Sequence, residues 1–343
     1  KMMNTGNKKI LSISIAAYNA EKYIADCLDS LCDESIIEKL DIIVVNDGSK
    51  DATEKITQKY VQKYPNSIRH VKKENGGWGS TVNKGMELAE GKYFKLLDVD
   101  DWYFTENLND FVEFLEKVDA DIVLSAFSMY DDNLGRVYAE KKYPFEHGKI
   151  YNIDDVINTV SDIQMHGVAV NTNIMKKADV HILEHCFYTD VQFVVENCCS
   201  ADNITYFDKS IYKYRVGIDG QSISAAGLLK HMGDNKRVAE RLINYMSENS
   251  FSEQKVKFLI NRINYSITLE YYTYIILNRH ERKTKLKEMN SFVDKYGIDY
   301  VPSSTEVRVV RKLGYNGCRV IHFCFECVRK LGKIFNVDFI QHA

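Results

Sequence analysis

The sequence predicts an α/β protein with a mostly parallel central sheet, helices on both faces, and a smaller helical domain after it. Three observations lead to this fold class. Short β-branched runs alternate with amphipathic segments, which is the pattern of repeated strand–helix–strand units. Polar or glycine-bearing turns follow several of these runs. After about residue 225 the strand patterns stop and the periodicity is helical.

The predicted strands are short apolar runs of the length that buried strands have. They comprise residues 10–17, 41–46, 67–72, 93–97, 122–127 and 204–214. Helices are predicted where apolar residues recur at three-to-four spacing, and they begin near Asn19, Asp51, Thr81 and Thr105. Residues 129–150 are polar and tyrosine-rich, so loops or a hairpin are expected there.

The change in periodicity predicts two domains. Residues 1–224 would form the α/β domain, with one half at about 9–128 and the other at about 129–224. Residues 225–343 would form the helical domain. A chain of 343 residues has the length for two such cores.

Composition excludes several classes of protein. Lys and Arg number 45 against 48 Asp and Glu, for a net charge of −3, so no basic field favours nucleic acid as a partner. No window approaches the roughly 18 apolar residues of a membrane span. The first nine residues lack the apolar core of a signal peptide. We therefore expect a cytoplasmic protein with reduced cysteines.

The run at 93–97 leads directly into three carboxylates, Asp98, Asp100 and Asp101. On an extended backbone Asp98 and Asp100 point the same way, while Asp101 points across. Like charges at a strand end repel one another unless a cation lies among them, and carboxylate oxygens suit Mg²⁺ or Mn²⁺. Taken alone, the pattern fits a cation site and a solvated acidic turn equally well.

Other polar turns are predicted to meet this acidic turn at one edge of the sheet. They are residues 18–19, 46–49 and 75–80. Ligands of parallel α/β sheets bind beyond the carboxyl ends of the strands, so this edge is the expected binding site. The glycine turn is not a dinucleotide fingerprint, because Val82 stands where the third glycine would be. It is not a P-loop, because no glycine precedes Lys84.

Residues 9 to about 220 resemble the inverting glycosyltransferases of family 2, which have the Rossmann-like GT-A fold. The order and spacing of the matching segments carry the resemblance; these are residues 12–19, 44–51, 75–77, 83–85 and 92–102. Residues 75–85 are similar to those of bacterial members that build surface polysaccharides. No Gln-x-x-Arg-Trp motif of processive polymerases occurs, so transfer of a single sugar is implied.

The resemblance implies roles for individual residues. Those expected to contact the nucleotide sugar are Ala17, Asn19, Asp47, Asn75, Gly76 and Asp98. Asp47 would hydrogen-bond the uracil. Asp98 and Asp100 match the Asp-x-Asp motif, with Asp100 on Mn²⁺ or Mg²⁺ and Asp98 on the ribose or the metal. Asp190 occupies the position of the catalytic base.

The chain departs from the family pattern in three places. Ala16 replaces a frequent proline, Val82 replaces an arginine that faces the nucleotide, and Thr189 replaces the acidic residue that commonly precedes the base. Asp190 lies at a predicted helix start, so a helix N-cap is its alternative role. Asp47 precedes a glycine, and a structural Asx turn is its alternative role.

Four further residues are candidates for the acceptor site or for a lid. They are His166, Trp102, Gln221 and Ser222. A lone histidine beside a glycine also fits a structural role, and a tryptophan at the rim can stack on a sugar or pack on the core. The loop that carries the last two residues contains glycines, as closing loops often do.

Residues 307–335 form a basic amphipathic segment with two interpretations. It could contact the anionic inner face of the plasma membrane, near a lipid-linked acceptor. It could instead pack its apolar face into the helical domain or against a second copy of the chain.

The resemblance thus implies a metal-dependent, inverting transfer of one sugar from a UDP-sugar, such as UDP-glucose, UDP-galactose or an N-acetyl derivative. The acceptor would be a hydroxyl of a glycan, lipid-linked or protein-linked molecule in surface polysaccharide or glycoconjugate assembly. The nucleotide sugar would bind the half at 9–128 and the acceptor the half at 129–224. The alternatives are a sugar nucleotidyltransferase, whose glycine-rich loop residues 16–21 lack, and a non-catalytic sugar-nucleotide-binding subunit.

Overall fold

The computed structural model describes residues 9–217, 222, 224–276, 279–297, 305–314 and 316–317. The chain divides into two compact units. One comprises Lys1–Gln221 and Met246–Leu259, and the other comprises Ser222–Tyr245 and Ile260–Ala343. The predicted site residues from Ala17 to Asp190 all lie in the first unit.

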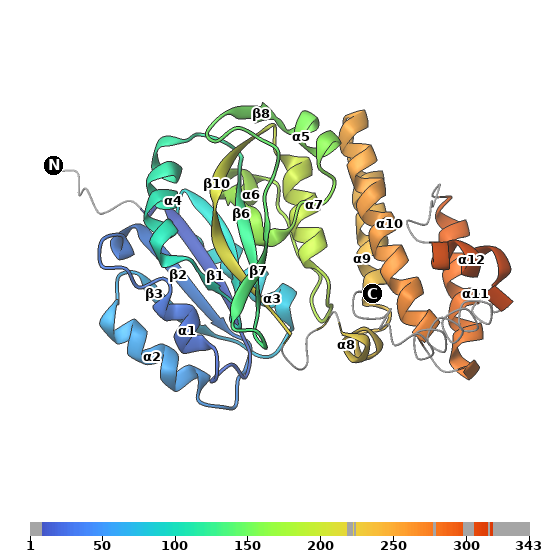
Figure 1. Cartoon of the computed structure of the whole chain (residues 1–343), viewed down its shortest axis with the longest axis horizontal. Helices are drawn as coiled ribbons and strands as arrows, with labels where there is room; N and C mark the ends of the chain where they lie inside the picture. The colour runs from blue at the N-terminus through green and yellow to red at the C-terminus, as the bar shows by residue number, and fades with distance from the viewer. Residues whose placement is uncertain are drawn as a thin grey trace, which may run out of the picture. The chain divides into compact units, whose positions relative to one another are not determined.

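The first unit contains a ten-stranded sheet (Figure 1) with the order β3-β2-β1-β4-β9-β6-β10-β5, to which β7 adds beside β6 and β8 beside β10. The strands are β1 Leu11–Ala17, β2 Leu40–Asn46, β3 Ile68–Lys72, β4 Tyr93–Asp98, β5 Trp102–Tyr103, β6 Ile122–Asp131, β7 Arg136–Lys141, β8 Ile150–Asn152, β9 Val168–Asn171 and β10 Asn203–Val216. The hairpin expected within 129–150 is formed by β6 and β7.

The first four strands of this order run parallel, as the strand–helix–strand pattern predicts. The short strand β9 then lies antiparallel between β4 and β6, and β6 pairs in parallel with β10. The predicted α/β class is confirmed. The sheet as a whole is mixed, because β9, β5, β7 and β8 each join it antiparallel.

Helices cover both faces of the sheet. In the first unit they are α1 Ile24–Asp29, α2 Thr53–Lys63, α3 Trp78–Leu88, α4 Thr105–Lys117, α5 Ile153–Thr159, α6 Thr172–Lys177 and α7 Asp190–Ser200, with the short 3-10 turns η1 Ile37–Lys39 and η2 Met165–Gly167. Apolar residues of α1 and α4 share one buried cluster with Leu11, Ile13 and Ile15 of β1. On the opposite face, Phe193 of α7 packs against Phe94 of β4.

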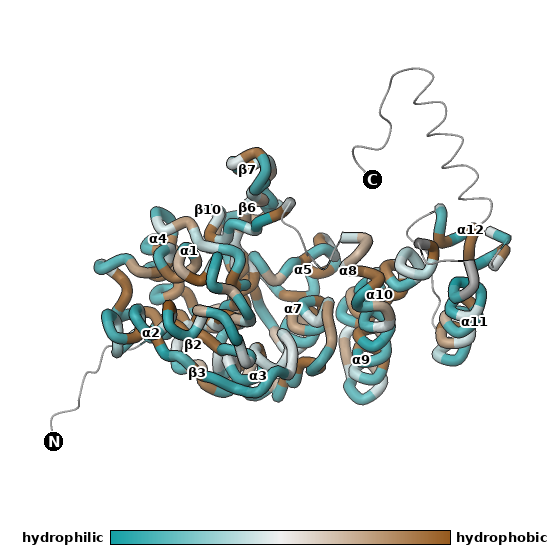
Figure 2. The backbone as a smooth tube through the Cα atoms, turned by 90° about the horizontal axis from the view of Figure 1, so that it is seen from below, coloured by the Kyte–Doolittle hydropathy of each residue, from teal (hydrophilic) through white to brown (hydrophobic). Residues whose placement is uncertain are grey.

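The described residues beyond 224 are helical. They form α8 Ala225–Lys230, α9 Asp234–Glu248, α10 Glu253–Ile276, α11 Arg279–Tyr296 and α12 Thr305–Leu313, which confirms the predicted helical C-terminal region. Figure 2 shows α9 alternating between hydrophilic and hydrophobic residues, with Val238, Leu242 and Ile243 among its buried ones. None of the described helices combines the length and the apolar composition that crossing a membrane requires.

The basic segment at 307–335 is described only at 307–314 and 316–317. Most of these residues belong to α12, in which Val307 and Val310 are buried and Arg311 pairs with Asp294 of α11 at 3.3 Å. The rest of the segment lies outside the described residues, so membrane contact and packing against a second copy both stay predictions.

Close packing of α3 on β1 requires a glycine at residue 85. A methyl group there would overlap the hydroxyl of Ser14 and would lie 2.6 Å from its Cβ. We expect Gly85→Ala to lower the free energy of unfolding by about 1–3 kcal/mol, because overpacking pushes the helix off the strand. Urea denaturation followed by circular dichroism measures this change.

The double variant Ser14→Gly/Gly85→Ala tests the cause of that loss. It removes the atoms that the new methyl group would meet, so it is expected to recover part of the lost stability. Wild-type stability in Gly85→Ala alone would contradict the close approach of α3 to β1.

Candidate active site

The carboxylates predicted at the end of β4 form a compact turn over residues 98–101, which we call the acidic turn. Its backbone closes through a 3.0 Å hydrogen bond from the Asp101 N–H to the Asp98 carbonyl. On the α3 side, the Trp78 indole N–H donates to Asp98 Oδ1 at 2.7 Å. Because Trp78 begins α3, this bond connects the acidic turn to the glycine turn just before that helix.

Strand β10 holds the acidic turn from the other side. The Tyr212 hydroxyl donates to Asp101 Oδ2 at 2.6 Å, and the Arg215 N–H donates to Asp101 Oδ1 at 2.7 Å. The Arg215 Nε–H donates to the Asp100 carbonyl at 2.8 Å. Asp101 is 2% exposed, and both of its oxygens are bound to β10.

Electrostatics within the acidic turn favour the neutral acids. Burial raises the pKa of Asp98 to about 7, and the charges of Asp100 and Asp190 add to this effect. Burial also raises the pKa of Asp100, although its own backbone and the Arg215 guanidinium oppose the shift. Burial and the two neighbouring carboxylates place the pKa of Asp101 well above its usual range. A bound cation would reverse this preference.

The residues present fit a divalent cation that is held partly by the chain and partly by the phosphates of a bound ligand. Asp98 and Asp100 offer hard carboxylate oxygens, whereas Asp101 is already bound to β10. Across the described residues, no group of three His, Cys, Asp or Glu side chains is arranged to hold a metal ion. Mg²⁺ is commonly bound through one or two carboxylates plus substrate phosphates, and this donor set is of that kind.

Asp47, at the end of β2, organises the glycine turn at residues 75–77. Its Oδ1 accepts from the Gly76 N–H and from Lys73 Nζ, both at 2.9 Å, and its Oδ2 accepts from the Gly77 N–H at 2.8 Å. The Asn75 side chain donates to the Asp47 carbonyl at 3.1 Å. A carboxylate has about four acceptor positions, so three are filled here and one remains.

The loop after β1 lies beside this cluster. The Asp47 N–H donates to the Ala17 carbonyl at 2.9 Å. Asn19, with a φ of 48°, receives the Lys50 N–H on its side-chain oxygen at 2.9 Å and donates its own N–H to Ser49 Oγ at 3.0 Å. The structure therefore brings together the predicted nucleotide-binding residues of three separate loops.

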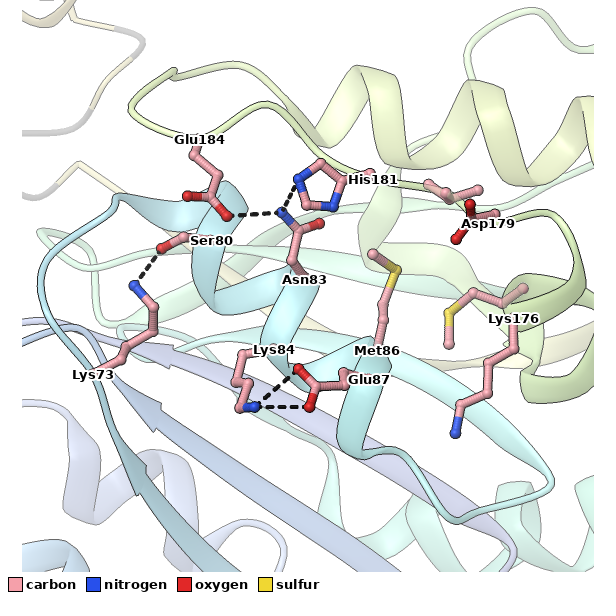
Figure 3. A pocket seen from close by; sticks show the side chains of 12 residues that line it. Lys73, Ser80, Asn83, Lys84, Met86, Glu87, Lys176, Asp179, His181 and Glu184 are labelled. Atoms are coloured by element: carbon pink, nitrogen blue, oxygen red, sulfur yellow. Dashed lines mark hydrogen bonds and ion pairs between the residues drawn. The ribbon is translucent and has the colours of Figure 1, made fainter.

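A cavity of about 550 Å³ lies between α3 and the segment at 175–184 (Figure 3). Figure 3 shows Asn83 directed toward His181 and Glu184, and Lys84 paired with Glu87 on the same helix. Lys73, which binds Asp47, lies at one end of the cavity. No residue of the acidic turn lines it, so this cavity is separate from the predicted cation site.

Asp190 is the first residue of α7, and the segment before it lies on the glycine turn. The His185 N–H donates to the Gly76 carbonyl at 2.7 Å. Thr189 occupies the N-cap position without a side-chain capping bond. Asp190 contributes, after burial and Asp100, to the raised pKa of Asp98, so it lies within electrostatic reach of the acidic turn. Thr189 and not Asp190 therefore takes the N-cap position, so the cap alternative for Asp190 is wrong. Its role as base stays a prediction.

The other candidates for the acceptor site or for a lid are Trp102, Gln221 and Ser222. The Arg215 guanidinium lies 4.4 Å from the Trp102 ring, and Tyr130 meets that ring edge-on at 4.9 Å. Gln221 lies outside the described residues, and Ser222 is described within a turn. Acceptor or lid roles for these residues stay predictions.

His166 is buried within an aromatic cluster. Its ring lies 5.1 Å from Phe127, 4.8 Å from Tyr212 and 4.4 Å from Tyr214. Burial, with the nearby charge of Lys95, lowers the pKa of His166 to about 3. The imidazole is therefore neutral at physiological pH and packs beside two tyrosines of β10; contact with an acceptor stays a prediction.

Lys95 is fully buried on β4 without an acidic partner within the described residues. Its ammonium group donates to the carbonyls of His166 at 2.6 Å and Val168 at 3.3 Å. Burial lowers the pKa of Lys95 from 10.5 to about 7. This lysine thus holds the turn that carries His166, and it carries a partial charge near neutral pH.

Comparison with known proteins shows which protein family this region resembles. Residues 12–175 match the family model described as Glycosyl transferase family 2. Residues 12–175 are thus a glycosyltransferase family 2 region. The match contains the predicted nucleotide-binding loops and the acidic turn, and it confirms the family and the enzyme class that the sequence motifs imply.

Two relatives extend the similarity beyond the matched region. The minor teichoic acid biosynthesis protein GgaB of Bacillus subtilis (strain 168) is 28% identical over 284 residues, which are 80% of this chain and 27% of GgaB. The poly(ribitol-phosphate) β-N-acetylglucosaminyltransferase TarS of Staphylococcus aureus (strain Mu50) is 24% identical over 309 residues, 88% of this chain and 51% of TarS. The chain thus spans about half or less of these relatives.

Solved structures confirm the GT-A fold of this glycosyltransferase. S. aureus TarS 1–349 in complex with UDP-GlcNAc has a TM-score of 0.67 at 19% identity, covering 92% of this chain and 91% of that one. A mannosyltransferase of Pyrobaculum calidifontis in complex with GDP-Man and Mn²⁺ has a TM-score of 0.51 at 11% identity, covering 90% and 86%.

Sequence reasoning missed several contacts of this site. Trp78 lies in the turn at 75–80 that is predicted to meet the acidic turn, but its bond to Asp98 is not predicted. Lys73 follows β3 without any motif, and its role at Asp47 appears only in the fold. Tyr212 and Arg215 lie beyond register shifts in β10, between Phe207 and Ser210 and between Ser210 and Tyr212. Simple alternation along that strand therefore does not predict which face of the sheet these two side chains occupy.

The buried lysine makes stability depend on pH. Between about pH 7 and 10.5 the unfolded chain keeps the Lys95 proton and the folded chain releases it, so the unfolded state binds more protons. The wild type therefore gains stability as pH rises through this window, by about 1 kcal/mol per pH unit, and loses it as pH falls toward 7.

Replacing this residue removes that dependence. We expect the difference in unfolding free energy between wild type and Lys95→Met to move in favour of the wild type from pH 7 to pH 9. Urea titrations of both proteins at three pH values measure it. Parallel pH profiles would contradict the buried, proton-releasing lysine.

Proposed function

We propose that this glycosyltransferase moves one sugar from a UDP-sugar to a hydroxyl of a bacterial surface polymer, with inversion, using Mn²⁺ or Mg²⁺ at Asp98 and Asp100. One observation carries the proposal. The hydrogen bond between Trp78 and Asp98, which lie 20 residues apart, joins the glycine turn to the acidic turn at the edge of the sheet. Such an edge is where parallel α/β sheets bind their ligands.

The uridine is proposed to bind between the first loop and the glycine turn. Asp47 has one acceptor position left after its bonds to Gly76, Gly77 and Lys73, and the N3–H of uracil is a suitable donor for it. Ala17, Asn19 and Asn75 border the same space through the bonds that fix these loops.

The diphosphate is proposed to lie at the acidic turn. A cation bound there supplies Lewis-acid stabilisation of the leaving group. The chain itself contributes the carboxylates of Asp98 and Asp100, held in a turn that is bonded from two sides. Asp98 would also reach the ribose.

Transfer is proposed to occur in one displacement. The acceptor oxygen forms a bond to the anomeric carbon as the bond from that carbon to the diphosphate oxygen breaks, and UDP leaves with the electron pair. Asp190 takes the acceptor proton, a contribution of about 10²–10⁴-fold for a general base. A single displacement with one base inverts the anomeric centre.

The proposed acceptor class follows from the relatives. TarS is named for transfer of N-acetylglucosamine to poly(ribitol-phosphate), and GgaB for minor teichoic acid biosynthesis. We therefore propose a polyol-phosphate polymer as acceptor and UDP-N-acetylhexosamine or UDP-hexose as donor.

UDP release across a panel of UDP-sugars tests the reaction class. We expect turnover with one or a few donors in the presence of Mn²⁺ and polyol-phosphate polymer, and loss of that turnover with a chelator. Formation of UTP and sugar 1-phosphate from a UDP-sugar and added pyrophosphate would indicate a nucleotidyltransferase. Donor binding without UDP release from any donor would indicate a non-catalytic subunit, and turnover indifferent to chelator would contradict the cation.

Asp190→Asn tests the base role of that residue. Asn keeps the shape of the side chain but cannot accept the proton, so the base role predicts a fall in kcat of about 10²–10⁴-fold with UDP affinity retained. The matched control is Glu184→Gln, an exposed carboxylate of the same segment, which should keep wild-type kcat. Near-normal kcat in Asp190→Asn would contradict the base role.

A further inference from the structure

Asp101, the third carboxylate of the acidic turn, is directed away from the predicted cation. Its Oδ2 accepts from the Tyr212 hydroxyl and its Oδ1 from the Arg215 N–H. The residue is 2% exposed. Asp101 therefore binds strand β10, although the sequence places it beside the two carboxylates expected at the metal.

The hydroxyl of Tyr212 joins both ends of the turn. It donates to Asp101 Oδ2 at 2.6 Å and accepts the Asp98 backbone N–H at 3.2 Å. The Tyr212 side chain is fully buried, so no water competes for these bonds. A single hydroxyl thus spans the two residues that flank Val99 and Asp100.

Arg215 holds the middle of the turn. Its Nε–H donates to the Asp100 carbonyl at 2.8 Å, and its Nη1 pairs with Asp132 at 2.7 Å. The guanidinium also lies over the rings of Trp102 at 4.4 Å and Tyr23 at 5.2 Å. Because the arginine binds the backbone carbonyl of Asp100, it restrains the backbone from which the Asp100 carboxylate projects.

We infer that Asp101, Tyr212 and Arg215, which we call the β10 brace, are positioning residues that fix the Asp98 and Asp100 carboxylates for the cation and the diphosphate. This inference rests on the proposed function of the site. Carboxylates crowded at one turn repel one another, and they keep a ligand geometry only if the surrounding groups hold them. The brace supplies that restraint without contacting the substrate.

Tyr212→Phe and Tyr103→Phe form a matched pair that tests the brace. Both tyrosines are buried, and the Tyr103 hydroxyl donates to the Leu96 carbonyl at 3.2 Å, outside the acidic turn. Each variant loses one buried hydroxyl and should lose similar stability. Only Tyr212→Phe should weaken the Mn²⁺-dependent part of UDP binding, by roughly 10-fold.

Isothermal titration with UDP, in Mn²⁺ and in chelator, separates this effect from general destabilisation. The affinity in chelator should be the same in wild type and both variants, because the Asp47 side of the site is untouched. Asp101→Asn, which keeps the side-chain shape, should show the same Mn²⁺-specific loss. It tests the brace independently if Tyr212→Phe does not fold.

The possible outcomes distinguish failure of the β10 brace from failure of the proposed cation role. Equal Mn²⁺-dependent affinity in wild type, Tyr212→Phe and Asp101→Asn would overturn the brace and leave the proposed function intact. An equal loss in Tyr103→Phe would also overturn it, because the effect would then be one of stability. A wild type whose UDP binding ignores Mn²⁺ would overturn the cation role and, with it, the brace.

Discussion

The crowding of three carboxyl groups in one turn is the constraint on which the rest of the site depends. Burial raises the pKa of each of them, and their mutual repulsion adds to the effect at Asp98 and Asp101. The chain accommodates them by giving each a different partner. Asp98 receives the Trp78 indole, Asp101 receives β10, and the backbone of Asp100 receives Arg215. These partners come from segments up to 115 residues away in the sequence, so the acidic turn depends on contacts that the folded sheet brings together.

The same bonds hold the loops of the proposed nucleotide-sugar site in place before any ligand binds. Asp47 closes the glycine turn by accepting from Gly76 and Gly77, and Trp78, one residue further on, reaches Asp98. Two short hydrogen-bonded steps therefore connect the end of β2 to the end of β4. A site whose loops are bonded to each other in this way loses little conformational freedom when a ligand binds.

Much of this arrangement could be predicted from the sequence, and the missing part has a physical reason. The alternation of strands and helices and the position of the polar turns depend on local patterns, and the parallel half of the sheet and the clustering of Asn19, Asp47 and Asn75 follow from them. The contacts of Tyr212 and Arg215 depend on β10, whose irregular register changes which face each residue occupies. The burial of Lys95 within an apolar strand also has no local pattern, because only the fold places the His166 carbonyl 2.6 Å from it.

The two carboxylate sites, Asp47 and the acidic turn, differ in the counter-charge that the chain provides, and this difference supports the proposed placement of the nucleobase at one and of the diphosphate at the other. Asp47 is paired with Lys73 at 2.9 Å and accepts two backbone N–H groups as well, so its charge is balanced from within and its remaining acceptor position suits a neutral nucleobase. At the acidic turn the nearby cation, Arg215, pairs with Asp132 and binds a backbone carbonyl. The carboxylates of Asp98 and Asp100 thus retain a demand for positive charge that an incoming divalent ion can meet. A nucleotide sugar has a neutral base at one end and a diphosphate that can bind a metal ion. It therefore matches the charge balance of both proposed sites, Asp47 for the base and the acidic turn for the diphosphate.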